Sequence, residues 1–156
     1  MSEREVTPGG SEVFRYEEPQ KDAQPPDMSD SNMDDIVAHC EKHFGPVSNV
    51  SHELTSEKVH VDVHIIPANE KLEFVTLFTT GMSDLPMNAP EGAEDTRYSE
   101  LTLHLPADWP FDREDWHKDT AISWPVELLR FLARMPHLYE TWLSYGHTVP
   151  NGQPPQ

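Results

Sequence analysis

The run Lys58-Val-His-Val-Asp-Val-His-Ile-Ile66 alternates hydrophobic and polar side chains along its length. Such a period of two is typical of a β-strand, because successive side chains point to opposite faces of a sheet. One predicted face carries Val59, Val61, Val63 and Ile65, and the other carries His60, Asp62 and His64. We expect the second face to meet either water or a polar covering.

A second run, Leu72-Glu-Phe-Val-Thr-Leu-Phe-Thr-Thr80, places bulky side chains on both faces, which predicts a strand in the interior of the sheet. Two further strands are predicted over 48–54 and 97–105. Short connections between the first three strands favour an antiparallel meander. A longer loop, 81–96, precedes the fourth strand.

Helical patterns lie on both sides of the predicted strands. The first begins near Ser31, continues through an acidic first turn, and ends at Gly45-Pro46. A second helix is predicted from Trp124 or Pro125 to Met135. The order of elements predicts an α+β fold, with a mainly antiparallel sheet of about four or more strands flanked by helices.

The predicted C-terminal helix has a proline near each end. Pro125 lies where a first-turn proline is tolerated, and Pro136 is expected to end the helix. Its buried stripe is expected to consist of Leu128, Leu129 and Leu132, which recur at helical spacing.

The chain length of 156 residues is that of one domain. Residues 1–30 are acidic, contain proline and have few strong hydrophobes, so we expect a largely flexible N-terminal tail. Residues 31–152 form the predicted domain, and 153–156 are expected to be a frayed C-terminus.

The composition is strongly acidic, with 28 Asp and Glu against 11 Lys and Arg and a formal net charge of −17. This charge argues against direct binding of nucleic acid or an anionic membrane, and it permits a basic protein partner. No apolar run reaches the roughly 20 residues that span a bilayer. The N-terminal residues do not resemble a signal peptide, and Cys40 is the only cysteine, so we expect a cytoplasmic protein.

One strand pattern permits an enzymatic hypothesis. His60, Asp62 and His64 share a strand face, and His52 or His104 from neighbouring strands could complete a metal site. A metal-dependent hydrolase is therefore one alternative. A polar sheet face is the favoured interpretation, because no partner that would orient these ligands is evident, and we assign no metal ligand.

Other reactive side chains also have simpler interpretations. Cys40 lies on the apolar stripe of its helix, so it is interpreted as a buried structural thiol rather than a nucleophile paired with His39 or His43. The carboxylates of the 81–96 loop are interpreted as a solvated acidic loop; they are Asp84, Glu91, Glu94 and Asp95. No motif for phosphate binding or nucleophilic catalysis is present, so we expect no catalytic residue and no cofactor.

Several motifs occur together in one order. They are Thr80-Gly-Met-Ser-Asp84, Leu105-Pro-Ala-Asp-Trp-Pro110, Trp124-Pro-Val126 leading to Leu132-Ala-Arg-Met-Pro-His137, and Tyr145-Gly-His-Thr-Val-Pro-Asn151. In this order they resemble the suppressor of fused domain, with its short bacterial members most similar, over roughly residues 31–152. The resemblance implies an α+β domain without catalytic activity.

The resemblance also implies a function. Larger animal members bind a transcription factor, held partly as an added strand, but this chain is too short for their second domain. Bacterial relatives resemble immunity proteins that neutralise a cognate toxin by direct binding. We therefore expect a protein-binding module, with a toxin of basic surface as partner. A regulatory subunit with another partner is a further alternative, and the oligomeric state stays open.

The motif residues divide into two expected roles. Gly81 is expected to allow a tight turn, Trp124 and Pro125 to set the start of the long helix, and Gly146 to give backbone freedom. The predicted partner contacts are Met82, Ser83, Asp84, His147 and Thr148. For His147, a structural hydrogen bond within its loop is the favoured alternative to partner contact.

Overall fold

The fold is built on one antiparallel sheet in the strand order β1-β2-β3-β4. The computed structural model describes residues 5–16, 19 and 31–150. The strands are β1 (Asn49–Ser51), β2 (Asp62–Ile66), β3 (Phe74–Thr80) and β4 (Thr102–Pro106). The helices are α1 (Met33–Phe44) and α2 (Thr120–Leu138), with short 3-10 helices η2 (Met82–Asp84), η3 (Glu94–Thr96) and η4 (Trp116–Lys118). This architecture confirms the predicted α+β fold and its antiparallel meander.

The central position of β3 is also confirmed. β3 pairs with β2 on one side, where Phe78 faces His64, and with β4 on the other, where Val75 faces Leu105. Every residue of β3 from Val75 onward is buried. A strand that is covered on both faces needs large side chains on both, which is what its sequence supplies.

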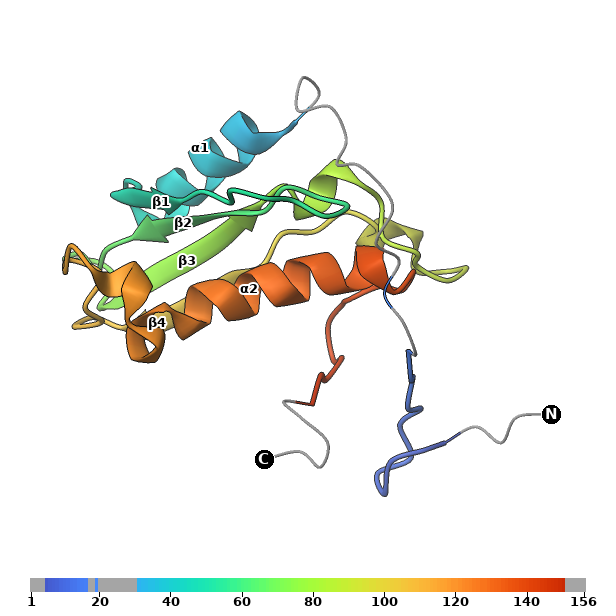
Figure 1. Cartoon of the computed structure of the whole chain (residues 1–156). Helices are drawn as coiled ribbons and strands as arrows, with labels where there is room; N and C mark the ends of the chain where they lie inside the picture. The colour runs from blue at the N-terminus through green and yellow to red at the C-terminus, as the bar shows by residue number, and fades with distance from the viewer. Residues whose placement is uncertain (1–4, 17–18, 20–30, 151–156) are drawn as a thin grey trace.

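The two helices cover opposite faces of the sheet, as Figure 1 shows. Under α1, Cys40 packs with Ile66 and Phe78. On the other face, α2 contributes Ile122, Val126 and Leu129 to a larger cluster of buried side chains, which also contains Val63, Ile65, Val75, Leu77 and Leu105 from the strands. The structure therefore has three layers, with the sheet in the middle.

The prediction that the polar face of β2 meets water or a polar covering is wrong at His64, whereas Asp62 does have a polar covering, formed by the side chains of His52 and His60. Asp62 and His64 are each only 4% exposed, and the His64 ring stacks on Phe78 with 4.7 Å between ring centroids. Toward the other end of this face, helix α1 packs apolar side chains against Ile66 and Phe78. Alternation in the sequence reported the two faces correctly but could not show what covers the polar one.

All four predicted strands are shorter in the structure, and the difference is best explained for β2. β2 begins at Asp62 rather than at Lys58, because Lys58 has a backbone φ of 63°, which an extended strand cannot accommodate. Val59 and Val61 are nevertheless completely buried, in a second cluster with Met82, Met87 and Ala133. The hydrophobic alternation therefore records burial beyond the end of the regular strand.

The predicted bounds of the C-terminal helix are wrong at both ends. α2 begins at Thr120, where the Asp119 side chain accepts a hydrogen bond of 3.1 Å from the backbone N–H of Ala121. Trp124 and Pro125 thus lie inside the helix and do not form its start. The helix also passes Pro136 and ends at Leu138. Pro125 and Pro136 are both buried. Their packing offsets the loss of the two backbone hydrogen bonds that proline, which has no N–H, cannot donate.

The buried stripe of α2 shares only Leu129 with the predicted one. Apart from the two prolines, its buried apolar members are Ile122, Val126, Leu129 and Ala133. Leu128 is 39% exposed, and Leu132 is half-buried. Ile122, Val126, Leu129 and Ala133 are spaced four, three and four residues apart and so share one helix face, but a helix predicted to begin at Trp124 or Pro125 left Ile122 out of that pattern. In the described ranges, no helix has the combined length and hydropathy needed to cross a bilayer.

Part of the predicted N-terminal tail contacts the domain. Residues 5–16 contain an antiparallel bridge between Val6 and Glu12, and the ring of Phe14 packs edge-on against Trp142 with 5.8 Å between centroids. The Tyr16 hydroxyl lies 2.5 Å from Thr141 Oγ1. Most of the remaining tail, and the predicted frayed end 153–156, lie outside the described residues.

The observed buried stripe predicts a contrast between adjacent leucines. Leu129→Ala should lower the free energy of unfolding by about 2–5 kcal/mol, because it opens a cavity beneath α2. Leu128→Ala should cost less than about 1 kcal/mol, because that side chain faces solvent. Urea unfolding followed by circular dichroism measures both. Equal losses for the two variants would contradict the assigned stripe.

Candidate functional site

The turn after β3 begins at Gly81, which approaches the backbone before β2 very closely. Gly81 has φ of +100°, and a Cβ atom at this position would lie 1.8 Å from the carbonyl oxygen of His60. Only glycine can occupy both the left-handed conformation and this narrow space. The turn therefore holds the 81–84 segment against the segment that leads into β2.

Met82 is buried by this turn and cannot serve as the predicted partner contact. It is 1% exposed and packs with Val59, Val61 and Ala133. Its carbonyl oxygen accepts a hydrogen bond of 3.0 Å from Nε2 of the buried His137. Because a carbonyl can only accept, the proton of this bond resides on Nε2. Burial lowers the pKa of His137, so the neutral imidazole is favoured.

Ser83 is tied to Glu100 rather than free in a loop. The Glu100 carboxylate accepts hydrogen bonds from the backbone N–H and hydroxyl of Ser83, at 3.0 and 2.7 Å, and from the Thr79 hydroxyl at 2.6 Å. Burial nevertheless raises the pKa of Glu100, because it disfavours the charged form more than these donors favour it. The negative charge of Asp84 acts in the same direction.

Asp84 differs from the predicted solvated carboxylate. It is half-buried, and this burial raises its pKa, although a hydrogen bond from Ser31 opposes the effect. The other three carboxylates of the loop, Glu91, Glu94 and Asp95, are exposed, as predicted. A hydrogen bond from the backbone N–H of Gly92 to Glu94 lowers the pKa of Glu94. The predicted contacts Ser83 and Asp84 are thus partly accessible, as the outer side of a rigid turn.

His60, Asp62 and His64 do not converge on one point. Both Asp62 oxygens are occupied: Nδ1 of His52 lies 2.9 Å from one, and Nε2 of His60 lies 3.1 Å from the other. His64 Nε2 instead lies 2.9 Å from the Thr80 hydroxyl, and burial lowers the pKa of His64. Among the described residues, no group of three or more His, Cys, Asp or Glu side chains could hold a metal ion.

The same network contains a hydroxyl, an imidazole and a carboxylate in sequence. The Ser56 hydroxyl lies 2.6 Å from Nδ1 of His60, whose Nε2 faces Asp62. In serine hydrolases the carboxylate contacts Nδ1 and the serine contacts Nε2, which is the reverse of this order. Asp62 also accepts a hydrogen bond from the backbone N–H of Glu53. The network therefore ties the 52–60 segment to the first residue of β2.

Cys40 is a core thiol, as the sequence predicted. It is 7% exposed, and burial raises its pKa, which disfavours the nucleophilic thiolate. His39 and His43 are exposed and pack against each other, with 4.7 Å between their ring centroids. Both imidazoles are exposed whereas the sulfur is buried, and within the described residues no hydrogen bond joins either ring to it.

The C-terminal motif forms an exposed turn. The backbone N–H of His147 bonds the Ser144 carbonyl at 3.2 Å, and Gly146 has φ of +81° with open space around it. The His147 ring packs edge-on against Trp142 at 4.9 Å between centroids. His147 and Thr148 are both exposed. Of the predicted partner contacts, these two are the most accessible to another protein.

The structure adds an apolar surface that sequence reasoning missed. Trp124 is 47% exposed, Leu128 39% and Phe131 51%, and together they form the α2 ridge on the outer side of that helix. Their spacing of four and three residues is helical, so a second stripe could have been found in the sequence. It was overlooked because the leucine was assigned to the core and the tryptophan to the helix start.

The tight approach at Gly81 predicts a large effect of one added methyl group. Gly81→Ala should lower the free energy of unfolding by at least about 3 kcal/mol, because the methyl group collides with backbone. Gly146→Ala is the matched control: its φ is also positive, but nothing lies within 4 Å of the new atom, so we expect a cost of about 1 kcal/mol. Thermal unfolding compares the two, and equal costs would contradict the assigned contact.

The raised pKa of Glu100 predicts the sign of a pH effect. Above its ordinary pKa of 4.5, the folded chain holds a proton on Glu100 that the unfolded chain has lost, so this group's contribution to stability falls as pH rises through the raised pKa. Glu100→Gln cannot ionise and should lack this fall. Urea unfolding between about pH 4.5 and 7.5 measures the difference. If Glu100→Gln shows the same pH dependence of stability as the unaltered chain, the assigned role of Glu100 is refuted. Glu91→Gln in the exposed loop is the control.

Comparison with known families agrees with the sequence motifs. The family model of the suppressor of fused protein (SUFU) matches residues 57–156, well over half of the chain. Searches of curated proteins and of solved structures gave no match. The match begins inside the predicted domain 31–152, whose boundary at residue 31 stays a prediction. By this match, the chain belongs to the suppressor of fused protein family.

Proposed function

We propose that this protein is a non-enzymatic immunity protein, which neutralises a bacterial toxin in the cytoplasm by binding it directly. Family membership carries the proposal, because the suppressor of fused domain is a protein-interaction module. The side chains considered for catalysis support it too. The carboxylate of Asp62 and the thiol of Cys40 are both engaged in the packing of the domain.

The charge of the chain supports a basic partner. Residues 36–156 contain 18 Asp and Glu but only 8 Lys and Arg, an excess of ten negative charges. A toxin that acts on nucleic acid needs a cationic surface to bind its substrate. An acidic protein is attracted to such a surface and can cover it, which both speeds association and blocks the substrate.

The exposed apolar side chains provide anchors that charge alone does not. Trp124 and Phe131 on the α2 ridge are large aromatic side chains, the type that most often dominates binding energy at protein interfaces. Exposed apolar residues grouped on one helix face are typical of a protein-binding surface. His147 and Thr148 stay in the proposal as accessible contacts, whereas the buried Met82 does not.

The test is coexpression with the product of the adjacent gene. We expect a complex that copurifies and cells that survive expression of the toxin. Trp124→Ala with Phe131→Ala should weaken the complex by roughly thirtyfold, as loss of interface anchors does. Tyr98→Ala is the matched control, because Tyr98 is an aromatic residue that is 61% exposed but lies outside the α2 ridge.

Two results would contradict the proposal in different ways. If the two proteins do not copurify and the cells are not protected, the immunity function is refuted. A stable complex with a harmless protein, without protection from any toxin, would instead support a regulatory subunit of the same family.

A further inference from the structure

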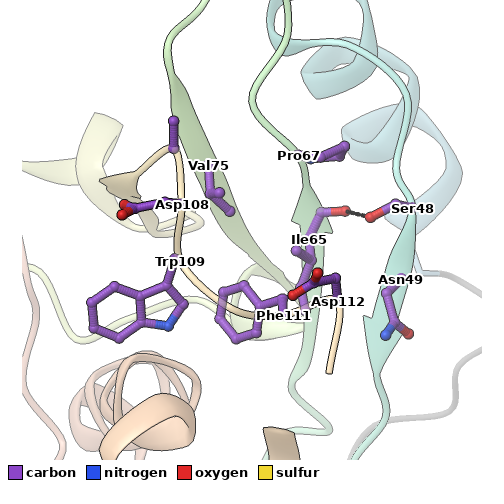
Figure 2. Close-up of a pocket in the computed structure, with 10 residues that line it drawn as sticks. Ser48, Asn49, Ile65, Pro67, Val75, Asp108, Trp109, Phe111 and Asp112 are labelled. Carbon is purple, nitrogen blue, oxygen red and sulfur yellow. Dashed lines mark hydrogen bonds between the residues drawn. The ribbon is translucent and has the colours of Figure 1, made fainter. Parts of the chain in front are cut away.

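A cleft of about 710 Å³ opens beside the start of β1, at the end of the sheet. The 107–112 loop forms one wall, and Figure 2 shows Trp109, Phe111 and Asp112 along it. Ser48, Asn49 and Pro67 lie on the opposite side. We propose that this cleft, named here the aromatic cleft, receives an arginine side chain from the protein partner.

The floor of the aromatic cleft is apolar. Ile65 of β2 and Val75 of β3 line it, and both are buried members of the cluster under α2. The aliphatic stem of an arginine can pack on such a floor while its charged end stays near the rim. A small anionic ligand would find no cationic side chain among the residues that line the cleft.

The walls supply both kinds of contact that a guanidinium prefers. Trp109 and Phe111 offer aromatic surface for a planar cation. Asp108 and Asp112 also line the cleft and are exposed. Within the described part of the chain, neither carboxylate has an ion-pair or hydrogen-bond partner, whereas nearby Arg113 is engaged by Asp115 and Asp119. The Asp112 carboxylate, which lies beside Phe111 in Figure 2, is therefore left for a cation from outside, and Asp108, whose carboxylate points away from Phe111, adds negative charge at the rim.

The rings are held in place from behind. The indole N–H of Trp109 donates a hydrogen bond of 3.1 Å to the carbonyl of Ile122 in α2. Phe111 packs edge-on against Trp116 with 4.9 Å between centroids. A site whose walls are already fixed loses little conformational entropy when it binds a ligand.

The aromatic cleft is continuous with the α2 ridge. The Trp109 ring, which lines the cleft, contacts Trp124 of the ridge edge-on, with 6.1 Å between centroids. One partner surface can therefore cover the ridge and insert a side chain into the cleft. This inference rests on the proposed protein-binding function and names the chemistry of one contact in it. Arginine is favoured over lysine because its planar fork suits both aromatic faces and carboxylates.

The aromatic cleft can be tested without the toxin, using the whole chain and short blocked peptides. The probe is acetyl-Ala-Arg-Ala-amide, and the neutral comparison replaces arginine by citrulline. Nuclear magnetic resonance should show saturable shifts of the Phe111 and Asp112 amides and of the Trp109 indole N–H with the arginine peptide. The absence of saturable shifts, or equal shifts with citrulline, would overturn the proposal. Equal affinity for the lysine analogue would overturn the choice of arginine.

Variants test the carboxylates. Asp108→Asn with Asp112→Asn should weaken binding of the arginine peptide by roughly tenfold, because both changes remove charge and keep the shape. Glu91→Gln with Asp95→Asn is the matched control: it removes the same charge from the exposed loop and should change affinity less than about twofold. If both double variants lose affinity for the arginine peptide equally, the loss reflects net charge alone and the site is refuted.

The same variants separate this inference from the proposed function. If the unaltered chain binds the toxin but the cleft variant binds it equally well, the cleft assignment is wrong and the function stands. If the unaltered chain binds the arginine peptide in the cleft but binds no toxin, the cleft stands and the immunity function is wrong.

Discussion

The structure depends on the contact between the Gly81 backbone and the carbonyl of His60. At this point the chain leaves β3 and turns back against the segment before β2, with no room for a side chain. The turn carries Met82 into the second core cluster and directs its carbonyl to His137 of α2. It also brings Ser83 to Glu100, at the approach to β4. The turn at Gly81 thus brings together the sheet, the loop that follows β3 and the helix α2.

The polar groups around this turn hold neighbouring segments of the domain together. Glu100 holds three hydrogen bonds from Thr79 and Ser83, and Asp62 holds His52, His60 and the backbone of Glu53. A new partner for either carboxylate would first have to displace one of these contacts. The proposed partner contacts lie elsewhere, on the outer face of α2 and in the adjoining cleft, where aromatic rings are accessible.

Much of the fold could be predicted because strand alternation reports burial directly. The alternation of 58–66 and the two-sided hydrophobicity of 72–80 located β2 and β3, and Cys40 was placed correctly in the core. The start of α2 was missed because proline statistics favoured Pro125 as a first-turn residue, whereas the Asp119 cap and the packing of Ile122 determine the true start. That error moved Leu128 into the predicted core and concealed the α2 ridge. The buried position of His64 was missed for another reason, since the Phe78 ring that stacks on it belongs to another strand.

The sequence by itself determined the fold class, the central strand, the acidic character and the family, because each is written in local periodicity, in composition or in short motifs. Only the tertiary structure decided which polar groups are accessible. Met82 and Asp84 belong to one motif, yet one is in the core and the other is half-buried, because the backbone turn at Gly81 directs them differently. The aromatic cleft likewise joins Ile65, Val75 and Asp112. Residues so far apart in sequence meet only when the sheet closes against the 107–112 loop, which no local pattern can report.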